Sequence, residues 1–316
     1  MNSLSLIIAY HNESRSAIQK CVDQLLDTID VEQYEVIIVD DGSYKPLDPI
    51  EGTTIIRHKT NQGVGTAFDT GVKSAKYDNL FLMGNDIRFI KNGWASKMVD
   101  EIEHHPQAFT CTTCVRLGRG KLSEVYETDI EKQLRNKKYG IGATIKMISS
   151  DSIIDAQWLP IGGKTVDEES YEVPCILGAA YGVKKDWYNY IGGWEGHRGW
   201  GTLEPMISIK SWLFGGSCRV APRIQVGHLF NIINKHGVHS KYISYNKILT
   251  ALLFIPNPDK MVVSLGERNN KSLDKLFSEN RVWIDKKIKE YQSKMKISFE
   301  EYCKKFNIDI HQLTQN

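Results

Sequence analysis

Residues 34–43 read YEVIIVDDGS, and this segment decides the fold. The β-branched run Val36 to Val39 predicts a strand, and Asp40, Asp41 and Gly42 end it with residues that favour turns. A strand this apolar on both faces is typical of a parallel sheet covered by helices on both sides. The segment therefore predicts a buried strand followed by a tight, acidic turn.

The same pattern repeats on either side of this segment. Apolar runs of strand length alternate with stretches where apolar residues recur at helical spacing, as at Ile18, Val22 and Leu25. Such alternation predicts an α/β fold with a mostly parallel sheet flanked by helices. The other expected strands are Leu4 to Tyr10, Thr54 to His58, Leu80 to Met83 and Leu177 to Val183, and the expected helices are Ser14 to Ile29, Gly65 to Ala75 and Pro205 to Phe214.

Composition divides the 316 residues into three parts. Residues 1–110 carry the regular alternation. Residues 111–258 open with a looser, glycine-rich stretch, to about residue 175, that we interpret as an insertion with long loops. Residues 259–316 are polar with amphipathic spacing, so we expect a C-terminal helical extension that packs on the rest of the chain or on a partner. The net charge of +2 says little about partners.

The N-terminus and the cysteines favour a cytoplasmic protein, bacterial or in a viral host. MNSLSLIIAYHNE has no basic region before its apolar run, which favours a first strand over a signal peptide. The sequence has no stretch of 18 apolar residues, so we expect no transmembrane segment. Cys111 and Cys114 form a C-x-x-C whose apolar surroundings, FTCTTCV, predict a buried strand end. No second pair follows at zinc spacing, so buried reduced thiols are favoured over a zinc or redox site.

Polar residues cluster where the expected strands end. His11 and Glu13 follow the first strand, and the turn 40–43 follows the second. Ligands of doubly wound sheets bind outside the carboxyl ends of the strands, where short acidic side chains can accept hydrogen bonds from a base or a ribose. Small residues from Gly63 onward let a helix approach sheet and ligand closely. A plain turn and plain helix–sheet packing remain open as alternatives.

The ordered motifs AYHNE, VIIVDDGS, NQGVGTAFDTG and FLMGND closely resemble the nucleotide-binding half of GT-A glycosyltransferases of the large inverting family. HNE followed by DDGS also resembles the polypeptide N-acetylgalactosaminyltransferases. GGWEGHRGWGTLEPMISIKSWLFGG is similar to the W-G-G-E-N and W-x-x-G-G segments of that family, and QVGHLF to its V-G-H-V-F. The likeness spans residues 4–230 except the middle stretch. It implies a GT-A (Rossmann-like) fold and sugar transfer from a nucleotide-diphosphate donor.

The resemblance also implies a donor site and a metal site. Asp40 matches the position that recognises the base, and Asp41 lies near the ribose. Asp86 matches the last ligand of an Asp-x-Asp or Asp-x-His motif, and His228 a further ligand, although a core role for His228 stays open. A carboxylate, an imidazole and phosphate oxygens suit Mn²⁺ (or Mg²⁺). The expected donor residues are His11, Glu13, Asp40, Asp41, Gly42, Ser43, Asn61, Gly63 and Asn85.

Two departures from the family pattern bear on the chemistry. The first metal position holds Gly84, or Met83 in a shifted alignment, so one carboxylate is missing and metal binding is expected to weaken or to use Asn85. After Trp200-Gly201 the acid arrives one residue late, as Glu204. We expect Glu204 to act as base toward an acceptor hydroxyl or to hold it, with a helix-dipole role as the alternative. These departures leave retention or inversion open.

Two features surround this expected centre. We expect Trp200 to stack on a sugar and Trp212 to lie in the core. From Pro205 to Pro258 there is no acidic residue, and such a segment would attract a diphosphate. Residues 231–245 are expected to form a mobile loop over the donor, where Lys235, His236 and Lys241 are candidates to touch phosphates, with plain surface residues as the alternative.

The favoured function is a glycosyltransferase that moves a hexose or N-acetylhexosamine from a UDP-sugar to a glycan or another hydroxyl acceptor. One alternative keeps the chemistry but modifies hydroxylated bases in DNA, where the basic stretch would contact phosphates. The other is a catalytically silent GT-A binding module, which the missing carboxylate favours.

Overall fold

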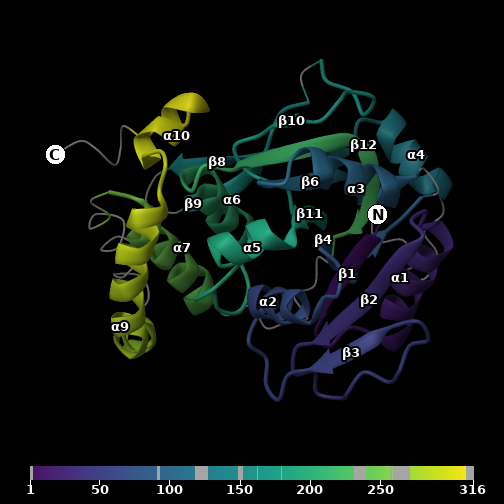
Figure 1. Cartoon of the computed structure of the whole chain (residues 1–316), viewed down its shortest axis with the longest axis horizontal. Helices are drawn as coiled ribbons and strands as arrows, with labels where there is room; N and C mark the ends of the chain where they lie inside the picture. The colour runs from purple at the N-terminus through teal and green to yellow at the C-terminus, as the bar shows by residue number, and fades with distance from the viewer. Residues whose placement is uncertain are drawn as a thin grey trace.

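A ten-stranded sheet runs through the centre of the computed structural model (Figure 1). The structure describes residues 3–90, 93–117, 127–148, 152–161, 163–178, 180–230, 240–256, 258 and 271–310. Along the sheet the strands are β10 (Tyr171–Glu172), β12 (Ser217–Leu229), β6 (Ala108–Leu117), β11 (Ala180–Lys184), β4 (Asn79–Gly84), β1 (Ser3–Tyr10), β2 (Gln33–Asp40) and β3 (Thr54–Arg57). Two short strands lie outside this order, β5 (Ile87–Arg88), which pairs with β12, and β7 (Tyr139–Gly140), which pairs with β6.

The sheet is mostly parallel, as the sequence predicted. Strands β3, β2, β1 and β4 pair in parallel, and so do β6 and β12. Strand β11 runs antiparallel between β4 and β6. The carboxyl ends of β1, β2, β4, β6 and β12 consequently meet at one edge of the sheet, where ligands of such sheets bind. A separate hairpin is formed by β8 (Ala143–Ile148) and β9 (Ser152–Trp158).

Helices cover both faces because successive side chains of a strand point to opposite sides. In β1, Leu6 and Ile8 pack with α1 and α3, whereas Ile7 packs with α2. Helix α2 lies so close that a Cβ added to Gly71 would be 2.3 Å from Ile7 Cγ2. The helices are α1 (Arg15–Thr28), α2 (Val64–Ser74), α3 (Trp94–His104), α4 (Glu127–Arg135), α5 (Lys185–Ile191), α6 (Leu203–Leu213), α7 (Ser240–Phe254), α9 (Lys271–Lys294) and α10 (Phe299–Lys305).

The C-terminal helical extension is present and packs on the rest of the chain. Helices α9 and α10 lie beside α7 and α6 at the end of the molecule opposite β3 (Figure 1). Tyr291 and Tyr302 are fully buried, and they belong to the same hydrophobic core as the helices α2, α5 and α6. The Tyr302 hydroxyl donates to the carbonyl oxygen of Pro174 at 3.0 Å. No helix within the described ranges is both long and apolar enough to cross a bilayer.

Two stretches differ from the sequence prediction. The expected insertion from residue 111 begins inside β6, a buried central strand that crosses the expected division between residues 110 and 111. Its Thr and Cys residues, including Cys111 and Cys114, fill the interior without a long aliphatic run. The second stretch is residues 240–245, which open helix α7 and do not form the expected loop. Tyr245 is fully buried, so core packing holds this helix.

Candidate active site

Asp40, the last residue of β2, has its carboxylate fully buried and bonded within the protein. It accepts hydrogen bonds from the backbone N–H groups of Ser43 at 3.0 Å and Leu47 at 3.2 Å, and it pairs with the Arg57 guanidinium. Burial alone would raise the pKa of Asp40, but the hydrogen bonds from Ser43, Leu47 and Arg57 outweigh it and hold the pKa below its usual value. Asp40 therefore stabilises the turn that follows β2.

The Asp41 carboxylate joins this turn to the loop before α2. It accepts the backbone N–H groups of Gln62 at 2.9 Å and Gly63 at 2.7 Å, and it lies 2.7 Å from His58 Nδ1. Gly42 has φ +66°, and a Cβ there would lie 2.3 Å from the backbone carbon of Thr60. The two loops thus fit together only with glycine at 42. Contact of Asp40, Asp41, Gly42 or Ser43 with a donor stays a prediction.

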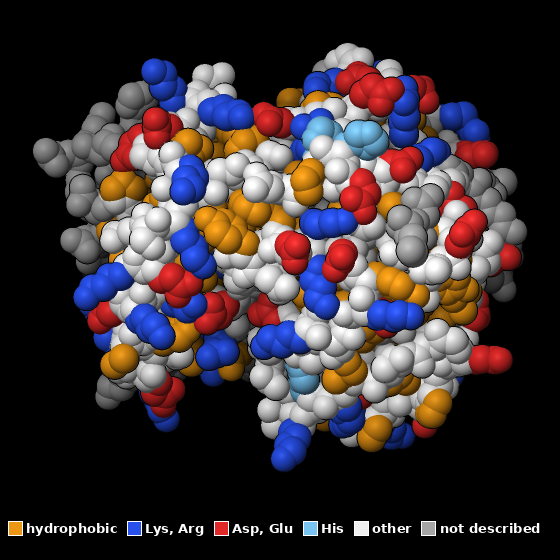
Figure 2. Space-filling view, viewed as in Figure 1, with side chains coloured by type: hydrophobic (Ala, Val, Ile, Leu, Met, Phe, Trp, Pro, Cys, Tyr) orange, Lys and Arg blue, Asp and Glu red, His pale blue; other side chains and the backbone are white. Residues whose placement is uncertain are grey.

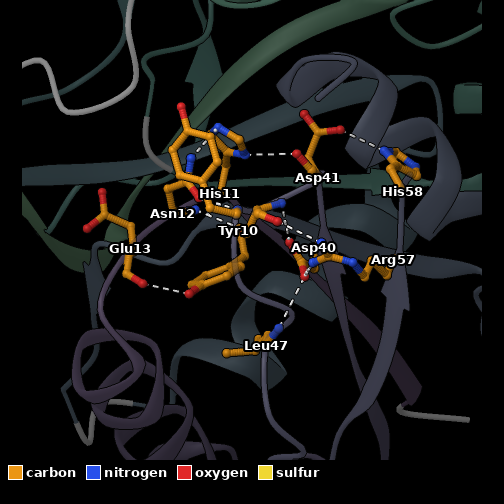
Figure 3. Close-up of polar contacts among 11 residues, drawn as sticks. Tyr10, His11, Asn12, Glu13, Asp40, Asp41, Leu47, Arg57 and His58 are labelled. Atoms are coloured by element: carbon orange, nitrogen blue, oxygen red, sulfur yellow. Dashed lines mark hydrogen bonds and ion pairs between the residues drawn. The ribbon is translucent and has the colours of Figure 1, made fainter. Parts of the chain in front are cut away.

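The segment after β1 is bonded to the same turn (Figure 3). His11 Nδ1 lies 2.8 Å from the carbonyl oxygen of Asp41, so Nδ1 donates, and His11 Nε2 then accepts from the Asn12 side-chain amide at 2.9 Å. Asn12 also accepts from the backbone N–H of Tyr44 at 2.8 Å. The sequence interpretation passed over Asn12, although asparagine is one of the few residues that tolerate its positive φ of 56°. The Glu13 side chain points away from the Asp40 and Asp41 carboxylates (Figure 3).

Gly63 connects the loop before α2 to the segment that carries Trp200. It has φ +103° and forms a parallel bridge with Gly199, and a Cβ at Gly63 would lie 2.4 Å from the Gly199 nitrogen. Only backbone fits between the two loops. Asn61 in the same loop is exposed, and Trp200 has 57% of its surface exposed. The exposed Trp200 is available to stack on a sugar, and Trp212 is buried in the core as predicted.

Asp86 and His228, which are distant in sequence, face each other at the carboxyl edge of the sheet. Asp86 Oδ2 and His228 Nε2 are 3.1 Å apart. Two ligands bonded to one divalent cation at about 2.1 Å and at right angles lie about 3 Å apart, so both atoms fit one cation. Among the described residues no third His, Cys, Asp or Glu completes a metal cluster, and phosphate oxygens or water would supply the remaining ligands.

The charge state of this pair follows from its partners. Burial acts to raise the pKa of Asp86, but the neighbouring His228 lowers it below the usual value. Burial acts to lower the pKa of His228, and the Asp86 carboxylate outweighs this and raises it to about 10. A divalent cation would replace the proton on Nε2 as the positive partner of Asp86.

Glu204 lies in the first turn of α6 and is fixed by Tyr181 of β11. The Tyr181 hydroxyl donates to Glu204 Oε1 at 2.7 Å. Burial, and next the Glu204 carboxylate beside it, raise the pKa of Tyr181 well above its usual value, so this hydroxyl keeps its proton. The Glu204 side chain also lies against Gly178, just before β11, where a Cβ would meet Oε1. Because Ala180 pairs with Met83, Gly178 and Glu204 lie toward the sheet edge that carries Asp86.

Basic residues of the acid-free segment from Pro205 to Pro258 lie beside acidic residues of other segments in the folded chain. Lys247 pairs with Asp155 at 2.8 Å, and Arg223 pairs with Glu169. Lys210 is buried, and burial lowers its pKa to about 8. On the face shown in Figure 2, basic and acidic side chains are interspersed. Acidic residues from other segments therefore pair with two of the basic residues of this segment.

The structure tests only the expected location of one of the three residues predicted to contact phosphate. Lys241 lies on helix α7, with its Nζ 4.9 Å from the centre of the Tyr242 ring, so its expected place in a mobile loop is wrong. The reason is the apolar content of residues 240–254, which buries Ile248 and Leu249 and folds the segment as a helix. Lys235 and His236 lie outside the described residues.

His197, in the segment between α5 and α6, was not singled out from the sequence. It is buried, and its Nε2 donates to the carbonyl oxygen of Gly201 at 2.8 Å. Burial lowers its pKa to about 4. The ring is therefore neutral at neutral pH and holds the turn that precedes Glu204.

Comparisons with known proteins agree with this architecture. Residues 5–159 match the family model described as Glycosyl transferase family 2. The chain is 25% identical over 245 residues to polypeptide N-acetylgalactosaminyltransferase 8 of Drosophila melanogaster, covering 72% of this chain and 38% of the relative. It is 23% identical over 238 residues to polypeptide N-acetylgalactosaminyltransferase 14 of Homo sapiens, covering 72% of this chain and 40% of the relative. The chain thus spans about two fifths of the length of these relatives.

A solved structure confirms the predicted GT-A fold. GalNAc-T7, crystallised with UDP, GalNAc and Mn²⁺, superposes with a TM-score of 0.69 at 16% sequence identity, over 98% of this chain and 57% of that one. At this identity the likeness concerns the fold alone. The expected mostly parallel sheet and its flanking helices belong to that fold.

Proposed function

We propose that this chain, which carries a glycosyl transferase family 2 domain over residues 5–159, is a metal-dependent glycosyltransferase that moves a hexose or N-acetylhexosamine from a UDP-sugar to a hydroxyl acceptor. The observation that carries the proposal is the 3.1 Å approach of Asp86 Oδ2 to His228 Nε2 at the carboxyl edge of the sheet. The relatives named above are N-acetylgalactosaminyltransferases, and the superposed enzyme was crystallised with UDP and Mn²⁺. These names support the sugar class and the donor.

Each group has a distinct task in this proposal. Asp86 and His228 would hold Mn²⁺ or Mg²⁺, which would neutralise the charge that develops on the leaving diphosphate. Glu204 accepts a hydrogen bond from the acceptor hydroxyl and takes its proton as the new bond forms. Tyr181 keeps Glu204 Oε1 in place by a 2.7 Å hydrogen bond. Trp200 offers an exposed aromatic face to a sugar ring.

The acceptor is a glycan or another hydroxyl compound. The relatives named above act on polypeptides by name, which leaves a protein hydroxyl within this class. A hydroxylated DNA base receives no support from them, and the pairing of Lys247 and Arg223 with acids removes part of the basic surface that suggested it.

The test is nucleoside-diphosphate release from a panel of nucleotide sugars with Mn²⁺, Mg²⁺ or EDTA. The wild type should release UDP from one UDP-sugar in the presence of Mn²⁺, and Asp86→Ala and His228→Ala should abolish this release. Glu103→Gln is the matched control, because it breaks a 2.7 Å surface ion pair with Lys184 outside the site. Absence of both release and calorimetric donor binding in the wild type would favour the silent binding module.

A further inference from the structure

Gly84 lies where the related motif has its first carboxylate, and the space beside its Cα is taken by Asp86. A Cβ added to Gly84 would lie 2.6 Å from Asp86 Oδ1, which is closer than such atoms approach. The other oxygen, Oδ2, faces His228 Nε2 at 3.1 Å. The Asp86 carboxylate therefore folds back over Gly84 while it faces the imidazole. Any side chain at position 84 would displace it.

Arg88 fixes the backbone on both sides of Asp86. Its side chain is only 2% exposed, and Nη1 donates to the carbonyl oxygens of Asn85 at 3.2 Å and Ile87 at 2.7 Å. The Asp86 carbonyl oxygen accepts the backbone N–H of Leu229 at 3.0 Å. The peptide groups around Asp86 are thus bonded to a buried guanidinium on one side and to β12, the strand of His228, on the other.

We propose that Gly84 and Arg88 are positioning residues that build a metal centre with a single carboxylate. Gly84 acts by leaving room for Asp86 Oδ1, and Arg88 by holding the turn from Asn85 to Ile87. The glycine is then a requirement of this centre and does not mark a ligand that has been lost. This inference rests on the metal site of the proposed function.

The charge of Arg88 affects how tightly such a centre binds a divalent cation. A buried guanidinium close to Asp86 offsets the one negative charge that the protein offers a cation. Two protein ligands and little net charge give weak binding of a free divalent cation, because the phosphate oxygens of the donor must complete the coordination. We therefore expect Mn²⁺ to bind much more tightly with UDP than without it.

The experiment measures Mn²⁺ binding, by the electron paramagnetic resonance signal of the free ion, with and without UDP and without turnover. Wild type is compared with Gly84→Ala, Gly84→Asp, Arg88→Lys and Arg88→Met. Gly163→Ala is the control for the substitutions of Gly84, because its added Cβ meets nothing within 4 Å, and Arg281→Met, at an exposed arginine, is the control for the substitutions of Arg88. Thermal melting of every variant reports whether the fold persists.

With UDP present, Gly84→Ala and Arg88→Lys should weaken Mn²⁺ binding at least about tenfold, the usual scale for groups that orient a ligand. Gly84→Asp should weaken it further, although it restores the carboxylate of the related motif. The melting temperature of Gly84→Ala should stay close to wild type, since the atom it displaces ends a flexible side chain. If Gly84→Asp binds Mn²⁺ as tightly as wild type or more tightly, the inference is wrong. If wild type binds no Mn²⁺ with UDP, the proposed metal site fails, and this inference fails with it.

Discussion

Two regions at the same sheet edge are held in different ways. The turns on the side where we propose that the donor binds (the donor-side turns), residues 40–43 with 57–63, are held by buried carboxylates that accept hydrogen bonds from within the protein. The segment on the proposed acceptor side (the acceptor-side segment), residues 192–204, is held by glycines in close contact and by helix α9, and it leaves Trp200 exposed. The difference teaches that a prominent acidic motif can stabilise loops, while the carboxylate that we propose as the base, Glu204, stands in a less conspicuous place.

The sharpest test of this comparison, with the largest expected effect, is Glu204→Gln. Glutamine keeps an oxygen to accept the 2.7 Å hydrogen bond of Tyr181 but cannot take a proton. We expect kcat to fall about 10³-fold, the usual range for loss of a general base, with an unchanged melting temperature. Steady-state kinetics with Tyr181→Phe in parallel separates the base from its support. A kcat within a few-fold of wild type would return Glu204 to a helix-dipole role.

Asp41→Ala tests the donor-side turns, where we expect a loss of stability and not mainly a loss of kcat. It removes the acceptor of the Gln62 and Gly63 N–H groups at a buried position, so we expect the free energy of unfolding to drop by about 3 kcal/mol. Urea denaturation measures this loss, with the exposed Asp48→Ala as control. A stable Asp41→Ala protein that has lost only donor binding would show that Asp41 is a ligand contact.

The acceptor-side segment should weaken in mild acid through His197. Its folded pKa of about 4 lies below the usual 6.5, so the unfolded chain binds more protons between these values, and stability falls as pH drops from 6.5 toward 4. One group can change the free energy of unfolding by at most about 1.4 kcal/mol per pH unit, so we expect a loss of about 2 kcal/mol between pH 6.5 and pH 5. His197→Gln should flatten the profile, whereas the exposed His104→Gln should not. Unfolding curves at a series of pH values decide between these outcomes.

The smallest expected effect concerns the support from α9. Trp283 Nε1 donates to Glu195 Oε1 at 3.3 Å, and the ring fills the space where a Cβ on Gly196 would lie, 2.2 Å away. Trp283→Ala should cost about 1–2 kcal/mol, less than a fully buried tryptophan, and should raise KM for the acceptor more than it lowers kcat. The adjacent Val282→Ala, at a side chain that is 86% exposed, is the control. Equal effects of the two substitutions would show that α9 does not support the acceptor-side segment.

The sequence predicted the elements whose signal is local. Helix α1 runs from Arg15 to Thr28 with Ser14 as its cap, within one residue of the range expected from apolar spacing. The ends of β2 and β4 were found because aliphatic runs stop at polar turns. Strand β6 was expected only as a buried strand end around Cys111 and Cys114, because its Thr and Cys residues lack such a run.

The site was predictable only in part, because its contacts join distant segments. Nothing near Asp40 in sequence shows that Arg57 will pair with it, or that Tyr181 will reach Glu204. The approach of Asp86 to His228 was expected from a family resemblance and not from spacing. The role that we propose for Gly84 could not be predicted from the sequence, because only the folded structure shows that Asp86 occupies the space beside its Cα.

The central place of β11 has a kinetic consequence. Ala180 pairs with Met83 and Tyr181 with Cys111, so the middle of the sheet closes only when segments far apart in the chain have met. Contacts of such long sequence separation form slowly, whereas β1 to β3 pair with near neighbours. The N-terminal βαβ portion can therefore assemble early, while the Glu204 carboxylate, which Tyr181 of β11 holds, reaches its place in one of the last steps of folding.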